Sequence, residues 1–333
     1  AAPADPAPGG LMVSLPTLGD LPLIGRPLRD RLMAPVAASF AADRLPFEQY
    51  TDPPGDPGLF GPGSVTWRVH GDPSMMIGGL SALMLQTLHP LAMAGVAEHS
   101  TYRDDPLGRL GRTASFVAGT TFGSTETAER LIRHVRAVHR RVRGVAPDGR
   151  PYSAEDPELL TWVHVTEVSS FLAAHQAFTP LPVRGELADR YYHEVAAVAE
   201  RLGAEDVPRT RAAVRAYFRR VRPELHAGEQ ALDTVAFLRR PLQGVSPAVA
   251  AAHQVVVRAA VALLPRWARE MLGLPHPSLV DLATVVPAAH LLLGALRVAG
   301  GPPQPLVEAR RRCAAEPPPP DRAPEPAGSS TAG

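Results

Sequence analysis

The sequence predicts an all-α protein with one large helical domain, and three observations lead to that prediction. Apolar residues recur at three- and four-residue steps, the spacing of a helix buried on one face. Several of these runs begin with Asp, Ser or Thr and end before Gly or Pro, as capped helices do. No internal repeat or convincing strand pattern interrupts them. With 333 residues, 45% of them hydrophobic, the chain can bury a sizeable core, either globin-like or bundle-like.

Both ends of the chain are too rich in Pro, Ala and Gly to contribute to that core. We expect residues 1–20 to be a flexible N-terminal segment, 21–312 to form the helical domain, and 313–333 to be a disordered Pro-rich tail. The opening AAPADPAPGG lacks the positive start and the apolar run of a secretory signal. The only cysteine, Cys313, provides no disulfide framework and no cysteine zinc site. The expected location is therefore the cytoplasm.

The first predicted helix is the run at residues 73–97, which is uncharged apart from His89 and long enough to span a bilayer. Polar residues and a proline interrupt this run, at Gln86, Thr87, His89 and Pro90. Because no basic flank follows, we interpret it as a buried core helix and expect no stable membrane insertion. Further helices are expected, in chain order, over 126–144, 156–178, 187–203, 207–221, 246–273 and 276–298.

All 34 basic residues are arginine, although the formal net charge is only +1. Biased codon usage is the simple explanation of this composition. The absence of lysine from the sequence excludes Schiff-base catalysis, a P-loop lysine and an amine ligand to a metal.

The segment RLIRHVRAVHRRVRG, residues 130–144, concentrates positive charge without any acidic residue. At about 100° per residue, one apolar stripe forms along the predicted helix. The stripe consists of Leu131, Val135, Val138, Val142 and Val145. His139 lies at the edge of this stripe, and Arg136 and Arg143 flank it on the same side.

An imidazole beside apolar surface and two guanidinium groups suits haem. The porphyrin needs an apolar slot, its iron needs a nitrogen ligand, and its propionates need cations. Two other interpretations stay open on these residues alone. One is a solvated basic face with a histidine at its boundary. The other is a nucleic-acid footprint, which is weak here because the chain has no recognition motif and is not basic overall, so no nucleic-acid partner is expected.

Other patterns that carry chemistry do not fit this chain. His134 and His139 are five residues apart and point to different faces. His164 and Glu167 share one face, but a di-iron bundle needs Glu-x-x-His in that order and twice. The sequence contains no Gly-x-Ser-x-Gly, Walker or Gly-x-Gly-x-x-Gly motif.

Four blocks in order resemble the family of MpaB-type and latex-clearing (rubber) oxygenases. These blocks are QTLHPLAMAGVAEHS, DPLGRLGRTASFVAGTTFGS, VRAVHRRVRG and DGRPYSAEDPELLTWVHVTEV, and the resemblance covers roughly residues 64–180. It implies a helical haem-b domain in which His139 coordinates the iron, with Arg136 and Arg143 around the cofactor. It also implies a block on the distal side of the haem, consisting here of Arg109, Arg112 and Thr113.

The middle residue of that distal block is a lysine in the rubber-cleaving members, whereas this chain has Arg112. Arginine stays protonated and has no lone pair for a metal. We therefore expect Arg112 and Thr113 to orient or polarise dioxygen, and Arg109 to help bind the cofactor. The family also places a carboxylate base near this pocket.

Several residues in these blocks have two interpretations. Glu98 is the nearest candidate for the family's carboxylate base in sequence order, and an acid at a helix end is the other interpretation of it. His89 and His164 are interpreted as buried, hydrogen-bonded histidines. Trp162 is expected in the core.

The resemblance implies a haem-b-dependent oxygenase that uses dioxygen on an apolar small molecule, unsaturated or isoprenoid-like, with an electron donor as a candidate partner. Cleavage of a carbon–carbon double bond and hydroxylation both fit these residues. The alternative function is a non-catalytic haem- or lipid-binding helical protein.

Overall fold

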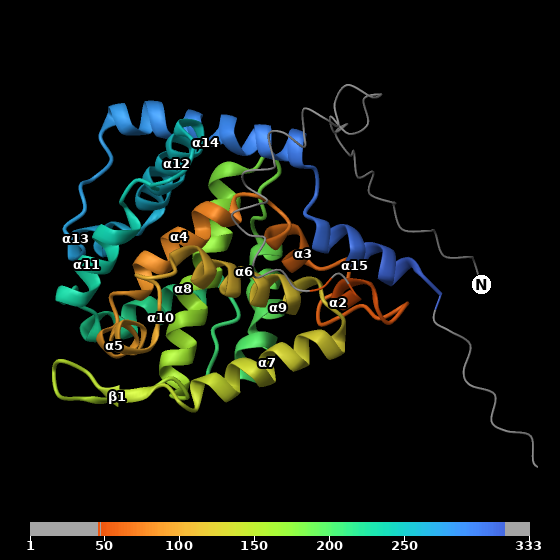
Figure 1. The fold of residues 1–333 in the computed structure, drawn as a ribbon, viewed down its shortest axis with the longest axis horizontal. Coiled ribbons are helices and arrows are strands. Elements are labelled where there is room, and N and C mark those ends of the chain that lie inside the picture. Colours follow the sequence, from red (N-terminus) through yellow and green to blue (C-terminus); the bar gives the residue numbers. More distant parts are fainter. Residues whose placement is uncertain (1–45, 47, 317–333) are drawn as a thin grey trace, which may run out of the picture.

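Helix α8 (Pro157–Phe178) runs through the centre of the fold, and α4 (Met75–Gln86) packs along it (Figure 1). The computed structural model describes residues 46 and 48–316. Apart from one short hairpin, these residues form helices and loops, which confirms the all-α prediction. The other elements are α2 (Glu48–Thr51), α3 (Val65–His70), α5 (Pro90–His99), α6 (Pro106–Phe122), α7 (Thr125–His139), β1 (Arg143–Val145), β2 (Pro151–Ser153), α9 (Glu186–Leu202), α10 (Arg211–Val221), η2 (Arg222–Glu224), α11 (Glu229–Leu238), α12 (Pro247–Leu263), α13 (Arg266–Met271), α14 (Leu279–Gly300) and α15 (Gln304–Ala314).

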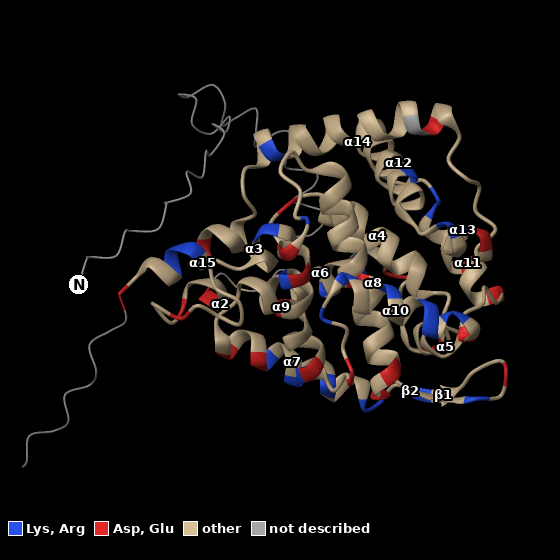
Figure 2. Ribbon diagram, turned by 180° about the vertical axis from the view of Figure 1, so that it is seen from behind, with Lys and Arg blue, Asp and Glu red and all other residues tan. Residues whose placement is uncertain are grey.

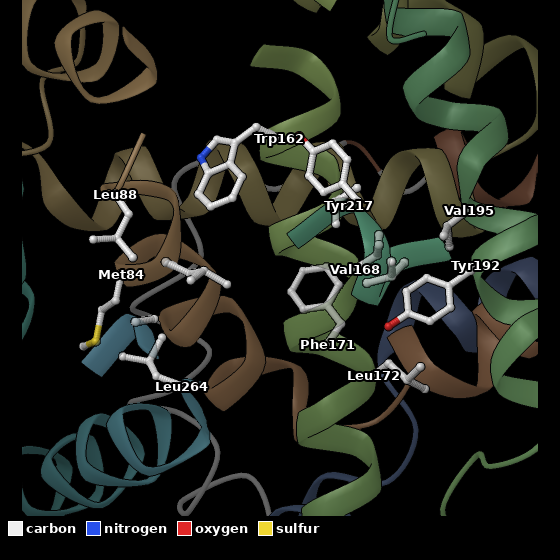
Figure 3. Packing of buried hydrophobic residues seen from close by; sticks show 14 of the residues in the cluster. Met84, Leu88, Trp162, Val168, Phe171, Leu172, Tyr192, Val195, Tyr217 and Leu264 are labelled. Carbon is white, nitrogen blue, oxygen red and sulfur yellow. The ribbon is translucent and has the colours of Figure 1, made fainter. Parts of the chain in front are cut away.

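The main core lies where α8 meets α4, α9 and α10. Figure 3 shows Trp162 and Phe171 of α8 beside Tyr217 and Tyr192, with Met84 on the α4 side. Trp162 is fully buried, and its Nε1 donates to the carbonyl of Gln86 at 3.2 Å. The expectation that Trp162 is a core residue is confirmed.

A glycine allows the close approach of α4 and α8. A Cβ added to Gly78 would lie 2.9 Å from Cα of Phe171 and 2.9 Å from the carbonyl oxygen of Ser170. No side chain fits at those distances, so the two helix backbones are in direct contact at this point.

The run at residues 73–97 is not one helix, and that part of the prediction is wrong. It forms α4 and α5, which meet at an angle of 106°. Pro90 is the first residue of α5, and His89 before it is extended, with φ −87° and ψ 113°. Proline lacks an N–H and disfavours helical geometry in the preceding residue, so the helix breaks here. Much of α4 is buried, as the core interpretation predicted.

The predicted helix at 126–144 is also too long. α7 ends at His139, and the chain then pairs β1 with β2 as an antiparallel hairpin. The turn is Pro147–Asp148–Gly149, in which Gly149 has φ of 86°. This turn sequence and Gly144 favour a hairpin over a continued helix.

Two other helix boundaries differ from prediction. The segment 246–273 forms α12 and α13, which are separated at Pro265. The segment 207–221 becomes helical only at Arg211, after the N-cap Thr210. The remaining predicted helices, 156–178, 187–203 and 276–298, agree with α8, α9 and α14 to within three residues.

The C-terminal helix α15 is fastened to the rest of the domain by a buried arginine. Arg312 donates to the carbonyls of Tyr50 (2.8 Å), Asp56 (2.8 Å), Phe122 (2.9 Å) and Gly123 (3.2 Å). Cys313 beside it is half-buried. The predicted flexible segment 1–20 and the predicted tail beyond residue 316 lie outside the described residues, as do residues 21–45 of the predicted domain.

Candidate active site

His139 is the last residue of α7, and its imidazole is half-buried. Its Nδ1 atom is buried and has no hydrogen-bond partner among the described residues. Burial lowers the pKa of His139 below its ordinary value; Glu155 opposes this shift, and the charge of Arg109 adds to it. His139 is therefore neutral near pH 7, the form in which a ring nitrogen can bind a metal.

The capping and spacing of α7 direct His139 inward. The Ser124 side chain caps the helix by accepting from the Thr127 N–H at 3.3 Å. Ala128, Ile132 and Val135 then precede His139 at steps of four, three and four residues, and the first two are fully buried. The predicted stripe is partly wrong, because Val138 and Val145 are 45% and 60% exposed.

Arg109 of α6 is the arginine whose charge reaches this imidazole. Its Nε donates to Oγ of Ser100 at 3.2 Å, and its Nη1 donates to the Thr113 hydroxyl. That hydroxyl donates in turn to the Arg109 carbonyl at 3.1 Å. Burial lowers the pKa of Arg109, the charge of Arg112 lowers it further, and Glu167 opposes both effects. The half-buried guanidinium is thus held in place by two hydroxyl groups.

The carboxyl that interacts with Arg109 inside the fold is Glu167 of α8. Burial raises the pKa of Glu167 to about 7, although the charge of Arg109 acts in the opposite direction. His164, one turn earlier on the same face, has its pKa lowered by burial to about 4. A carboxyl that titrates near neutral pH can both donate and accept a proton. His164 was expected to be a buried, hydrogen-bonded histidine, and Glu167 was weighed only as a partner of His164 in a di-iron site, so no proton-transfer role was predicted for Glu167.

His70, a hydrogen-bonded histidine, is an electrostatic neighbour of His164. His70 of α3 is hydrogen-bonded through Nδ1 to the Thr121 hydroxyl at 2.8 Å and through Nε2 to the Tyr191 hydroxyl at 2.9 Å. Burial and the neighbouring His164 lower the pKa of His70 to about 3. His70 is therefore a neutral, fully bonded imidazole that connects α3, α6 and α9.

The arginines expected around His139 lie on the outside of the fold. Arg136 is exposed and donates to the Arg201 carbonyl at 3.5 Å. Arg143 is not on the helix, because α7 has ended; it lies in β1 and donates to the Arg140 carbonyl. The prediction that Arg143 shares a helix face with His139 is wrong.

Arg112 points away from the interior. It is exposed, and its Nη1 lies 3.3 Å from a carboxylate oxygen of Asp105, at the start of α6. Arg109 and Thr113, one helical turn apart on α6, are half-buried and hydrogen-bonded to each other. Of the three residues in the predicted distal block, Arg109 and Thr113 are the two that contact each other inside the fold.

Glu98 and His89 contact aromatic residues, Tyr152 and Trp162 respectively, and among the residues that the structure describes neither forms a hydrogen bond or ion pair with His139. The Tyr152 hydroxyl donates to the Glu98 carboxylate and lies 3.2 Å from Nε2 of His99. His89 is buried against Trp162, and burial lowers its pKa to about 4. Its Nδ1 has no hydrogen-bond partner within the described part of the chain, so the expectation that His89 is buried is confirmed but a bond at this atom is not found.

Two cavities of about 620 and 220 Å³ lie away from His139. The larger is lined by parts of α11, α12 and α14, and the smaller lies between α8, α9 and α10. Within residues 46 and 48–316 no group of three or more His, Cys, Asp or Glu side chains is placed to share a metal ion. A haem iron held by one histidine does not require such a group.

One comparison with known proteins gives a match. A family model described as "ER-bound oxygenase mpaB/B'/Rubber oxygenase, catalytic domain" matches residues 67–298. This range includes every residue described above around His139. No curated protein and no solved structure matches the chain.

Proposed function

Since the chain belongs to the mpaB/rubber oxygenase catalytic-domain family and is thus an enzyme of the oxygenase class, we propose that it is a haem-b-dependent oxygenase. The proposed iron ligand is His139. The observation that carries the proposal is the neutral, half-buried imidazole with a buried Nδ1 that lacks a partner among the described residues. Among the described residues the Nδ1 atoms of His89 and His253 are also buried without a partner, and His139 is the one that the sequence resemblance identifies as the iron ligand. A buried polar atom without a partner calls for an explanation. An iron ligand, or a bond formed only when the cofactor is present, provides one.

The residues around His139 fit the charges of haem. The exposed guanidinium groups of Arg136 and Arg143, near the end of α7, suit propionates that stay at the solvent edge. The half-buried guanidinium of Arg109, whose charge acts on His139, would add positive charge near a bound cofactor. When bound, haem supplies the binding of dioxygen and the one-electron chemistry, while the protein supplies the ligand and the orienting groups.

Arg109 and Glu167 are the groups we propose for the chemistry of this chain. Arg109 is positioned by the hydroxyls of Ser100 and Thr113, so its remaining N–H groups are oriented donors for developing negative charge. Glu167, with its pKa near 7, holds or releases a proton at its carboxyl oxygen. Arg112 then contributes mainly through its charge on Arg109.

The proposed substrate is an apolar, unsaturated small molecule, and dioxygen is the co-substrate. The family description, which includes rubber oxygenases, supports an apolar substrate. An electron donor remains a proposed partner.

Oxygen uptake tests the proposal. Protein produced with ample haem precursor is mixed with apolar alkenes and a chemical reductant in an oxygen electrode, with and without substrate. Substrate-dependent uptake in stoichiometry with an oxidised product is the expected result. A haem-loaded protein that consumes no oxygen with any alkene would instead indicate a non-catalytic haem-binding protein.

A further inference from the structure

Helix α14 exposes a long apolar face. It is the one helix in the described residues that is long and apolar enough by itself to cross a membrane. Its most apolar 18-residue stretch has a mean hydropathy of 1.8, yet only 18% of that stretch is buried. Its exposed residues, called the α14 face below, include Leu279, Val280, Pro287, Leu291, Ala295 and Val298. Leu279, Leu291 and Val280 are 85%, 75% and 70% exposed. Exposed apolar area of this kind is typical of an interaction surface.

The opposite side of α14 is fastened to the domain. Val285, Ala289 and Leu293 are buried in a cluster with residues of α12 and with Phe178. Near its end, Arg297 donates to both carboxylate oxygens of Asp72 at 2.9 Å. The helix therefore lies along the surface of the domain (Figure 1).

Charged residues are confined to the two ends of α14. Figure 2 shows the helix without blue or red between the acidic residue of its first turn and the arginine near its end. The acid is Asp281, which forms a capping box with Ser278, and the arginine is Arg297. The hydroxyl of Thr284, on the exposed side, donates to the Val280 carbonyl of the same helix. His290, also exposed, packs its ring edge-on against Phe178. Between Asp281 and Arg297, the described part of the face thus offers two polar side chains to a partner, those of Thr284 and His290.

A cationic rim borders this face. The cavity of about 620 Å³ beside the first half of α14 has apolar walls that include Val257, Val261 and Val285. Three exposed arginines also line it, Arg239, Arg240 and Arg258. Asp281 is the only acidic residue that lines the cavity; hydrogen bonds from Ser278 and the charge of Arg258 lower its pKa. No acidic residue in the described part of the chain forms an ion pair with Arg239 or Arg240. We call the three arginines the arginine rim.

We propose that the α14 face and the arginine rim bind the surface of a bilayer that contains anionic phospholipids. The apolar face would lie at the level of the acyl chains, and the guanidinium groups would bind phosphate groups, as in helices that lie in the membrane interface. A bilayer satisfies a long apolar stripe and an adjoining set of cations at once. The inference requires neither haem nor the proposed oxygenase activity.

Sedimentation with vesicles tests this proposal on the full chain. We expect the protein to pellet with vesicles of phosphatidylcholine and phosphatidylglycerol, and much less with phosphatidylcholine alone. Leu291→Glu should weaken binding roughly tenfold or more, because it places a charge on the apolar face. Replacing all three rim arginines by Gln should weaken it roughly a hundredfold.

Two matched variants control for these changes. Val145→Glu places the same charge at an exposed apolar residue of the hairpin, on the side of the fold opposite α14 (Figure 1). Replacing Arg133, Arg140 and Arg141 by Gln removes the same charge from exposed positions on or next to α7. Both controls should pellet like the unmodified chain. Equal loss of binding in the controls, or a chain that stays in the supernatant with anionic vesicles, would overturn the proposal.

A fluorescent label tests the orientation directly. An environment-sensitive dye is attached at Ala295→Cys or at Val145→Cys, each with Cys313→Ser. Anionic vesicles should shift the emission to the blue at position 295 and leave it unchanged at 145. The emission of the label at position 295 could instead shift to the blue as the protein concentration rises, without vesicles. If Leu291→Glu then converts a dimer to a monomer, a second copy covers the face and the bilayer proposal is wrong.

Discussion

Arg297 and Asp72 form a paired contact that joins the end of α14 to the loop before α4, with both N···O distances at 2.9 Å. The two side chains are 22% and 15% exposed. Burial alone would raise the pKa of Asp72, but hydrogen bonds from Arg297 and Ser74, together with the charge of Arg297, hold it below its ordinary value. The pair therefore stabilises the domain while Asp72 is ionised.

Breaking this pair should destabilise the protein. Arg297→Ala is expected to lower the free energy of unfolding by about 2 kcal/mol at pH 7, since it leaves a buried carboxylate unpaired. Because the pKa of Asp72 is lowered in the fold, the stabilisation is present above the ordinary carboxyl pKa and is lost as pH falls through the lower, folded value. Urea unfolding across this acidic range measures both effects. Arg266→Ala, which breaks the exposed pair with Glu270, should have a much smaller effect, because water screens that pair.

The contact between α4 and α8 predicts opposite effects at adjacent glycines. Gly78→Ala should destabilise the protein by about 2 kcal/mol, because its Cβ would lie 2.9 Å from the α8 backbone. At Gly79 the nearest atom to an added Cβ is 3.8 Å away, on the Phe171 ring, so Gly79→Ala should stabilise the helix by about 0.5 kcal/mol. Thermal unfolding compares the two variants. Equal effects would contradict the packing described here.

The pKa of Glu167 predicts a pH-dependent stability. The pKa of Glu167 is about 7 in the fold, above the ordinary value of 4.5. Between pH 4.5 and pH 7, the folded haem-free chain therefore keeps a proton on Glu167 that the unfolded chain has released. The free energy of unfolding therefore falls as pH rises through that window. The difference in the free energy of unfolding between Glu167→Gln and the unmodified chain should therefore shift by about 2 kcal/mol in favour of the variant from pH 5 to pH 8. Urea titrations measure this gain, and Glu205→Gln, at an exposed acid, should show none.

The positions of two arginines on α6 predict different roles in activity. Arg109→Gln should reduce oxygen uptake about a hundredfold, because it removes an oriented interior charge. Arg112→Gln changes an exposed side chain next to Asp105 and should reduce uptake by less than about tenfold. Initial rates at saturating substrate give the comparison. A larger loss in Arg112→Gln would assign the distal role to Arg112, as the sequence resemblance implied.

The helices that could be predicted from the sequence are those with a regular apolar period and clear caps. α8 begins at Pro157, directly after its N-cap Asp156, and its predicted start agrees to within one residue. The break at Pro90 and the hairpin after His139 had local signals, namely a proline and a Pro-Asp-Gly turn, but apolar spacing was given more weight. α6 carries several glycines and was noticed only through the family resemblance.

The candidate site could be predicted only in part, because tertiary packing determines which side of each helix faces inward. His139 was identified from its place at the edge of an apolar stripe. The proximity of Arg109 to Glu167, from helices far apart in the chain, has no local signal. The resemblance named Arg109, Arg112 and Thr113 together, whereas in the structure Arg112 is exposed and paired with Asp105, and the other two are half-buried and bonded to each other.

Titration of the haem-free chain with hemin tests the central claim, that His139 binds haem iron, most directly. The unmodified chain should develop a strong Soret band, as should His134→Ala, which removes an exposed histidine from the same helix. His139→Ala should lose most of that band, and added imidazole should restore it by occupying the vacated position. An equally strong Soret band in His139→Ala and the unmodified chain, with an unchanged hemin affinity, would contradict the claim.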